Sequence, residues 1–396
     1  MSDPTISVCM MGRNNASTIE KALASVAGHV EEICYLDTGS TDGTRDIARG
    51  YADVYAEREW PDSFATARNW TLRMATKDFI LILDTDEYVA EPEAAFKQIR
   101  LHLRKGLAAL DLQVHNIIGV EDDGSVSLED YFWQTRVLAN VEQIEYEGVA
   151  HHQNFRSIRA WIKETEDRYQ DIGTRWERCP CEIVHTGYSL SVEETHAKYK
   201  DRVKLYERAE READDERLKV YYRYQRGCGY YHAGDHQQCI DILTALPLGM
   251  LKPDEDLQRL TVLCKAYLWQ HTHGTQIDFT TVIPYADDLV FKYPNPEGFV
   301  TASELYFQSG KPKHGLLLLV RAYAIADHPQ RKVSRKRLKG AVLGIIRRQG
   351  FDDLAKKAQY ATEQEIYQSF RILEKGLVEA IQIEDAARRP AIVRLT

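Results

Sequence analysis

The residues of this chain best suited to metal chemistry are three acids within four positions, Asp84, Asp86 and Glu87 of the segment D-T-D-E. They follow the uninterrupted apolar run Phe79–Leu83, which predicts a strand buried on both faces, as in a helix-covered parallel sheet. Ligands of such sheets bind outside the carboxyl ends of the strands. Clustered carboxylates repel one another unless a positive charge lies between them, and magnesium-type ions bind one or two carboxylates together with substrate phosphates. The segment therefore indicates either a cation that bridges a diphosphate or a solvated acidic turn.

The elements that would position these acids alternate between strand and helix. The sequence predicts strands at Thr5–Met11 and Glu32–Leu36 and a helix at Phe64–Ala75, which leads into the apolar run. This alternation is typical of a parallel sheet with right-handed crossovers. Both early strands end in polar residues on the edge where the acids lie, so we expect Arg13 and Asp37 to share one crevice with them.

Two common nucleotide-binding motifs are missing from the sequence. Neither G-x-G-x-x-G nor G-x-x-x-x-G-K-[ST] occurs, which argues against a dinucleotide fingerprint and a P-loop. A nucleotide can still be held by a carboxylate on its base or ribose and by a cation on its diphosphate. In that interpretation Asp37 contacts the nucleoside, and Asp84 and Asp86 bind the cation.

Composition excludes several classes of protein. The 396 residues are enough for two domains, and the net charge of −9 argues against binding nucleic acid or membranes through the whole surface. No apolar run reaches the roughly 18 residues of a spanning helix, and the first residues, M-S-D-P, do not look like a signal peptide. The seven cysteines include one close pair, Cys179 and Cys181, and we expect free thiols in a reduced, cytoplasmic protein.

Four motifs occur in order between Val8 and Glu87: V-C-M-M-G-R-N-N, Y-L-D-T-G-S-T-D-G-T, F-A-T-A-R-N and L-D-T-D-E. Together they resemble family 2 glycosyltransferases of the GT-A fold. The resemblance is to the branch that includes lipopolysaccharide-core glucosyltransferases and enzymes that glycosylate bacteriocin cysteines or serines. Two later stretches, Tyr146–His152 and Ile183–Tyr188, resemble the Y-x-G-x-V-H-E and I-x-H-x-G-Y motifs of the same branch. The resemblance covers about residues 5–210.

This resemblance implies inverting, metal-dependent transfer of a sugar from a UDP-sugar, with Mn²⁺ or Mg²⁺ as the cofactor. Asp86 would coordinate the cation and so help to stabilise the UDP leaving group. His185 is a candidate third ligand because imidazole with carboxylates suits Mn²⁺, and its alternative is a hydrogen bond to a loop carbonyl. The residues implied in nucleotide-sugar binding are Met10, Arg13, Asp37, Arg68 and Asp84. For Arg68 the alternative is a pairing with a nearby acid.

The catalytic base is expected at His151. The branch commonly has glutamate where this chain has His152, although histidine can also accept a proton near neutral pH. Neighbouring residues of a strand face opposite ways, so only one of the two histidines can point into the site, and the register of the motif favours His151. The alternative is a structural histidine.

The second half of the chain is predicted to be helical from Val192 onward. Glu193–Arg217 is strongly charged and predicts a solvated connecting helix. Turn signals recur near Gly234, Gly274 and Gly310, spacings that suit helix-pair repeats of the tetratricopeptide type. The predicted fold is therefore an α/β GT-A domain with a mixed, Rossmann-like sheet at residues 1–190, a connecting helix at 191–218, and an all-α helical-repeat domain at 219–396.

The sequence leaves the acceptor open. A protein or peptide side chain held by the helical domain, a glycan, and a modified base in DNA are all possible. DNA is suggested by Arg331–Arg348, which carries many basic residues and no acid, although the same stretch also suits the solvated face of a helix. A rival of another class is an inert scaffold. The sugar and the oligomeric state also stay open.

Overall fold

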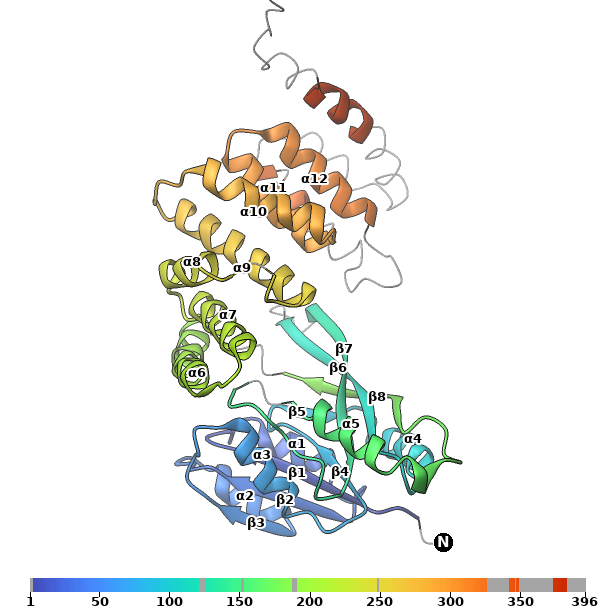
Figure 1. The fold of residues 1–396 in the computed structure, drawn as a ribbon. Coiled ribbons are helices and arrows are strands. Elements are labelled where there is room, and N and C mark those ends of the chain that lie inside the picture. The colour runs from blue at the N-terminus through green and yellow to red at the C-terminus, as the bar shows by residue number, and fades with distance from the viewer. Residues whose placement is uncertain are drawn as a thin grey trace, which may run out of the picture. The chain divides into compact units, whose positions relative to one another are not determined.

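The computed structural model describes residues 3–120, 126–150, 153–186, 191–247, 249–325, 342–345, 347–348 and 373–382. The chain divides into two compact units, Met1–Glu194 and Thr195–Thr396. Figure 1 shows strands and helices in the first unit and helices in the second.

The first unit is built on one mixed sheet of eight strands in the order β3-β2-β1-β4-β7-β6-β8-β5. Strands β1 to β4 are parallel neighbours, whereas β7 is antiparallel to both β4 and β6. Strand β8 is parallel to β6 and antiparallel to β5. The strands are β1 (Ile6–Gly12), β2 (Glu32–Asp37), β3 (Val54–Glu57), β4 (Phe79–Ile82), β5 (Glu87–Val89), β6 (Ala109–Val120), β7 (Val126–Ala139) and β8 (Trp176–His185).

Short helices connect these strands. Helix α3 packs against β1 and β2, and α4 packs against β8. The hydroxyl of Ser63 caps α3 by accepting a hydrogen bond from the Thr66 N–H at 3.2 Å. The helix ends at Leu72, slightly earlier than predicted. The helices are α1 (Ile19–Ala24), α2 (Thr44–Tyr51), α3 (Phe64–Leu72), α4 (Pro92–His102), α5 (Phe155–Glu164) and the 3₁₀ turn Asp167–Tyr169.

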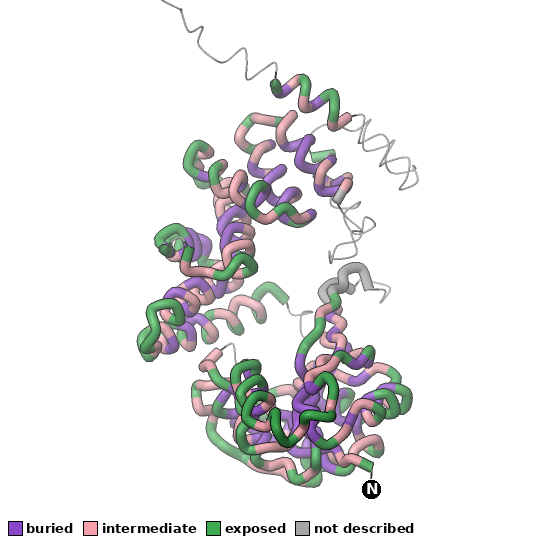
Figure 2. The backbone as a smooth tube through the Cα atoms, turned by 45° about the vertical axis from the view of Figure 1, so that its right-hand side comes forward, coloured by how far each residue is buried: buried purple, intermediate pink, exposed green. Residues whose placement is uncertain are grey.

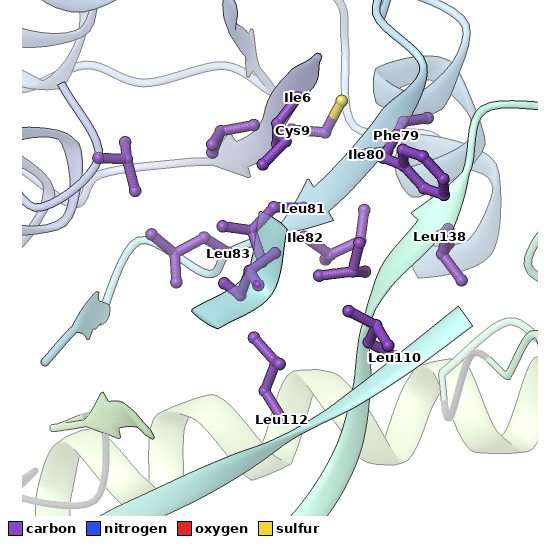
Figure 3. Close-up of a cluster of buried hydrophobic side chains, with 14 of the residues drawn as sticks. Ile6, Cys9, Phe79, Ile80, Leu81, Ile82, Leu83, Leu110, Leu112 and Leu138 are labelled. Atoms are coloured by element: carbon purple, nitrogen blue, oxygen red, sulfur yellow. The ribbon is translucent and has the colours of Figure 1, made fainter. Parts of the chain in front are cut away.

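The core of the first unit surrounds β4, as Figure 3 shows. All four residues of β4 are buried, and so is Leu83 after it. Ile6 of β1, Leu110 of β6 and Leu138 of β7 belong to the same apolar cluster. Full burial of each such side chain stabilises the fold by about 1.5–3 kcal/mol. The predicted doubly buried strand is therefore confirmed, and Figure 2 shows buried stretches of chain in the middle of the first unit.

Every element of the second unit in the described part of the chain is a helix. Three helix pairs, α7 with α8, α9 with α10 and α11 with α12, pack against each other. Gly234, Gly274 and Gly310 lie in the turns within these pairs and have φ angles of 83°, 93° and 75°, which glycine adopts most readily. The predicted turns are thus confirmed. The helices are α6 (Val192–Glu212), α7 (Glu216–His232), α8 (His236–Thr244), α9 (Pro253–Thr272), α10 (Phe279–Lys292), α11 (Pro296–Gln308) and α12 (Pro312–Ile325).

One predicted element of this region is wrong. The sequence predicts a single helix over Glu193–Arg217, but α6 ends at Glu212 and α7 begins at Glu216. The break has a local cause, because the carboxylate of Asp215 caps α7 by accepting from the Arg217 N–H at 3.3 Å. Aspartate favours such capping positions over helix interiors.

The predicted fold class, a mixed α/β sheet followed by a helical region, is confirmed. None of the helices in the described ranges combines the length and apolarity needed to cross a membrane. All seven cysteines are free and buried, as the expectation of free thiols required.

Candidate functional site

The parallel strands bring most of the predicted site residues to one edge of the sheet. Strands β1, β2 and β4 are neighbours, so their carboxyl ends meet there. Gly12 at the end of β1 lies opposite Asp37 at the end of β2, and Arg13 follows with an exposed side chain. Asp84 lies just beyond the end of β4. The chain thus places polar side chains from three separate segments where an open α/β sheet binds its ligands.

Asp37 is fully buried, and only one of its two carboxylate oxygens has hydrogen-bond partners among the described residues. Its Oδ1 accepts hydrogen bonds from the N–H groups of Gly39 at 2.9 Å and Ser40 at 2.8 Å, and it lies 3.3 Å from Nε of Arg45. Burial opposes ionisation, but the Ser40 and Gly39 bonds and the Arg45 charge hold the pKa of Asp37 below its usual range. Its Oδ2 has no hydrogen-bond partner among the described residues. The site therefore holds an ionised carboxylate with one acceptor oxygen to spare.

A second unsatisfied polar atom lies under the same edge. The hydroxyl of Tyr35, which is buried, has no hydrogen-bond partner in the described part of the chain. A Cβ at Gly12 would lie only 2.6 Å from this hydroxyl and 2.6 Å from Oδ1 of Asn15. Only glycine fits there without a shift of its neighbours. Sequence reasoning missed Gly12 and Tyr35, because their proximity depends on the register of β1 and β2.

The acidic segment forms a turn between β4 and β5 that is closed by two hydrogen bonds. The Glu87 N–H donates to the carbonyl of Asp84 at 3.1 Å, and the Asp84 N–H donates to Oε2 of Glu87 at 3.0 Å. Glu87 is buried inside this turn, whereas 42% of the Asp84 side chain is exposed. Burial raises the pKa of the Glu87 carboxyl to about 7, although the nearby Arg136 opposes the shift.

Two buried arginines supply the positive charge that the acidic turn needs. Arg68 of α3 pairs with Asp84, and Arg136 of β7 pairs with Glu87 and lies 3.6 Å from Oδ2 of Asp84. Both guanidinium groups are almost completely buried. The repulsion expected among the three acids is therefore offset by protein side chains, so the cluster does not by itself require a cation. For Arg68 the structure thus shows the second of the two roles expected from the sequence, a pairing with an acid. Its contact with a diphosphate stays a prediction.

His185 contacts Asp86 of the same turn. The end of β8 pairs with β5 so that His185 lies opposite Glu87, and its Nε2 is 3.3 Å from Oδ2 of Asp86. Its Nδ1 lies 2.8 Å from Oδ1 of Asn116, so the imidazole donates to the amide oxygen and turns Nε2 toward Asp86. Burial opposes protonation of His185, but Asp86 outweighs it and raises the pKa of the imidazole.

This pair fits a divalent cation in its chemistry. A carboxylate and an imidazole suit Mn²⁺, and a hydrogen bond from the second ring nitrogen is the usual support of a ligating histidine. In the described ranges no cluster of three or more histidine, cysteine or acidic side chains could hold a metal ion. A cation at Asp86 and His185 would thus need oxygens from a bound ligand, as Mg²⁺-type sites with substrate phosphates do.

Two predicted residues lie elsewhere. The side chain of Met10 is fully buried in the core of the first unit, so any contact with a nucleotide through this residue stays a prediction. His151, the expected base, and His152 lie outside the described residues. The chain before them returns to α3, because the Val149 carbonyl accepts from the Phe64 N–H at 2.8 Å.

The last residue of the F-A-T-A-R-N motif has a structural contact that sequence reasoning missed. The side-chain amide of Asn69 donates to the carbonyl of Tyr146 at 2.9 Å, and its Oδ1 accepts from the Tyr146 N–H at 2.8 Å. The neighbouring Arg68 reaches Asp84 from the same helix. One turn of α3 therefore holds both the acidic turn and the segment that leads to His151.

Sequence comparisons match part of this chain to a known family. Residues 7–157 match the family model described as Glycosyl transferase family 2. A TPR repeat-containing protein of Synechococcus elongatus is 43% identical over 82 residues, which are 21% of this chain and 20% of that protein. The SPbeta prophage-derived glycosyltransferase SunS of Bacillus subtilis is 38% identical over 85 residues, again 21% of this chain and 20% of the relative. The matches thus span about one fifth of the length of these relatives.

Solved structures give weaker likenesses. The mannosyltransferase PcManGT from Pyrobaculum calidifontis, in complex with GDP-Man and Mn²⁺, aligns with a TM-score of 0.37 and 13% identity over 81% of this chain and 88% of that chain. S. aureus TarS 1-349 in complex with UDP-GlcNAc aligns with a TM-score of 0.35 and 14% identity over 79% of this chain and 90% of that chain. The assignment comes instead from the sequence match, which contains Asp37, Asp84 and Asp86. Residues 7–157 of this chain are thus similar to glycosyltransferase family 2 domains.

Proposed function

We propose that this protein transfers a sugar from a UDP-sugar to an acceptor with inversion at the anomeric carbon and with the help of a divalent cation. The observation that supports this most directly is the convergence of Asp37, Asp84 and Asp86 at the carboxyl edge of adjacent parallel strands within the stretch that matches the family 2 model. The name of a relative, glycosyltransferase SunS, supports the same class of reaction.

The donor would bind across this edge. Oδ2 of Asp37 offers an unused acceptor, buried and ionised, for a donor group of the nucleoside. Asp84 would reach the ribose, and Arg13 and Arg68 are proposed to act near the diphosphate. A buried ionised acceptor selects a ligand donor strongly, because a ligand without that donor leaves the carboxylate oxygen unpaired.

Asp86 and His185 would hold Mn²⁺ or Mg²⁺. When bound, the cation supplies Lewis-acid stabilisation of the charge on the departing diphosphate. The role of the chain is to fix its ligands: Asn116 orients the imidazole through Nδ1, and the Thr186 N–H and hydroxyl both donate to the Asp86 carbonyl at 3.0 Å. Preorganised ligands of this kind need little rearrangement during the reaction.

The catalytic base would come from the part of the site that binds the acceptor. His151 is proposed to take the proton from the acceptor nucleophile as that atom forms a bond to the anomeric carbon. The bond from the same carbon to the diphosphate oxygen breaks on the opposite face, and UDP leaves with its electron pair. Imidazole suits this task because its ordinary pKa of about 6.5 lies near physiological pH.

A protein or peptide side chain or a glycan is the proposed acceptor. The helix pairs of the second unit support a partner-binding role, since stacked helix pairs present extended surfaces. Most of Arg331–Arg348, which suggested DNA, lies outside the described residues. Of its two described arginines, Arg348 pairs with Glu304 at 2.9 Å. Binding of duplex DNA is therefore one of the outcomes that the experiment below distinguishes.

The test is release of UDP from a panel of UDP-glucose, UDP-galactose and UDP-N-acetylglucosamine with Mn²⁺. We expect turnover with at least one donor, and we expect Asp86→Ala to abolish it. Asp46→Ala is a matched control, because Asp46 is an exposed aspartate on α2 of the same unit. Absence of binding and turnover with every donor would overturn the proposal and favour an inert scaffold. Salt-sensitive binding of duplex DNA would favour the nucleic-acid acceptor.

A further inference from the structure

A buried ion pair between Arg136 of β7 and Glu87 of β5 holds the acidic turn from within. We propose that this pair positions the turn Asp84–Glu87 so that the Asp86 carboxylate faces the cation and diphosphate of the donor. The inference rests on the proposed function, because it concerns how the same site binds its cation. Arg136 and Glu87 would act through Asp86 and touch neither the donor nor the acceptor.

Glu87 closes the turn with its backbone and its side chain. Its N–H donates to the Asp84 carbonyl, and its Oε2 accepts from the Asp84 N–H, at 3.1 and 3.0 Å. These two bonds join the first and last residues of the turn. The conformation of Asp86 between them is therefore coupled to the position of the Glu87 carboxylate.

Arg136 fixes that carboxylate. One guanidinium nitrogen pairs with Oε1 of Glu87, so both carboxylate oxygens of Glu87 are engaged, and the other lies 3.6 Å from Asp84. Arg136 and Glu87 are only 4% and 2% exposed. Water cannot replace either partner, and hydrogen bonds between charged groups are short and directional. The pair therefore determines where the turn lies on the sheet.

Asp86 is anchored differently from its two neighbours. Asp84 and Glu87 each meet a buried arginine, whereas the Asp86 carboxylate meets Nε2 of His185 at 3.3 Å. Its carbonyl accepts from Thr186 on the other side of the turn. The arginines thus offset the charges of Asp84 and Glu87 and leave the Asp86 carboxylate beside His185, an arrangement that suits a cation bound through one carboxylate.

The experiment measures Mn²⁺ binding to the full chain, by calorimetry in the presence of UDP, together with UDP binding in EDTA. The variants are Glu87→Gln, Arg136→Lys and the charge-neutral double variant Arg136→Met/Glu87→Gln. The double variant is included because removal of Arg136 alone leaves a buried carboxylate without its cation. Arg175→Lys is the matched control, since Arg175 is also a buried arginine of the first unit and donates to Gly106, Ile162 and Thr165 away from the turn. Thermal unfolding confirms that each variant is folded.

We expect Glu87→Gln and the double variant to raise the Kd for Mn²⁺ by about 10–100-fold, the usual effect of losing a group that orients a metal ligand. Arg136→Lys should raise the Kd for Mn²⁺ less than the double variant does, because lysine keeps the positive charge of arginine but not its planar fork of donors. UDP binding in EDTA and the Arg175→Lys control should stay near the parent values. A folded double variant with the parent Kd for Mn²⁺ would overturn the inference.

Asp86→Ala separates this failure from failure of the proposed function. If Asp86→Ala loses Mn²⁺ binding and the double variant keeps it, only the positioning role is rejected. Unchanged Mn²⁺ binding in Asp86→Ala would reject the proposed cation site itself, and the positioning role with it.

Discussion

Asn69 and Tyr146 are joined by two reciprocal hydrogen bonds, in which a single side-chain amide satisfies both the N–H and the carbonyl of a buried backbone unit. Asn69 lies directly after Arg68, which pairs with the acidic turn. Through these neighbouring residues, α3 connects the end of β4 with the segment before His151. The motif F-A-T-A-R-N thus has a structural explanation that does not depend on contact with a nucleotide.

Replacement of Asn69 should cost stability. Asn69→Ala removes both hydrogen bonds from the Tyr146 backbone, and loss of a hydrogen bond to a buried group costs about 1–3 kcal/mol. We expect a loss of that order in the free energy of unfolding, measured by urea denaturation. Gln98→Ala, which removes an exposed amide from α4, is the control and should change stability little. Equal midpoints for the two variants would show that the Asn69 bonds do not form in solution.

Glu32 should make stability depend on acid pH. Burial opposes its ionisation, but hydrogen bonds from Ser7 and Thr76 outweigh that effect and lower its pKa. A carboxyl whose pKa is lower in the folded than in the unfolded state stabilises the protein above the ordinary value of about 4.3, and the contribution is lost as the pH falls through the folded-state pKa.

The corresponding measurement is the free energy of unfolding of the parent and of Glu32→Gln between pH 7 and pH 2. We expect the variant to be less stable at pH 7 and the difference to shrink in acid below about pH 4.3. Thr76→Val, which removes one donor at 2.6 Å from Glu32, should act in the same direction with a smaller effect. A difference that stays constant over the whole range would contradict the prediction.

His185 should set the affinity for the cation. His185→Ala removes a proposed ligand, and Asn116→Leu removes the acceptor of its Nδ1–H while keeping the imidazole. We expect Asn116→Leu to raise the Kd for Mn²⁺ by about 10–100-fold and His185→Ala to raise it at least as much. His29→Ala, at a histidine stacked on Phe96, is the control. Identical Mn²⁺ titrations for His185→Ala and the parent would reject the ligand role.

Gly12 and Tyr35 should be energetically coupled. Gly12→Ala places a methyl group 2.6 Å from the Tyr35 hydroxyl and from Asn15, and overpacking of this kind costs about 1–3 kcal/mol. Tyr35→Phe removes a hydroxyl without a partner among the described residues, so alone it should leave stability unchanged or raise it. A double-mutant cycle in urea should show that Tyr35→Phe recovers part of the Gly12→Ala loss. Strict additivity of the two changes would contradict this.

The glycines of the second unit offer a matched pair. Gly234 and Gly274 have similar positive φ angles, but a Cβ at Gly234 would lie 2.8 Å from the His196 ring, whereas nothing lies within 4 Å of one at Gly274. Gly274→Ala should therefore cost only the left-handed strain of about 1–2 kcal/mol. Gly234→Ala should cost more, and His196→Ala should reduce the excess. Equal losses, measured by chemical denaturation, would show that the His196 contact is unimportant.

The sequence was sufficient to predict the elements and the edge of the sheet. Phe79–Leu83 has no alternation, so its burial on both faces could be inferred, and parallel neighbours then bring Asp37 and Asp84 to one edge. The turns at Gly234, Gly274 and Gly310 could be predicted equally well, because they depend on the positive φ angles that glycine adopts locally.

The partners of the acids could not be predicted. Arg136 lies 49 positions from Glu87 in the chain and reaches it because β7 is inserted antiparallel beside β4. Nothing in the local sequence of Q-T-R-V marks it as a site residue. The expectation that three acids need a cation was incomplete for the same reason, since two buried arginines from distant segments already lie beside them.

The burial of every cysteine has a practical consequence. Thiol reagents should react slowly with the native protein, so a cysteine introduced at the surface would be labelled selectively without removal of the natural ones. Leu101 and Phe291 are suitable positions, one in each unit, because their side chains are 73% and 77% exposed. A pair of fluorescent dyes at these positions would report the distance between the two units in solution and any change in it when UDP and Mn²⁺ are added.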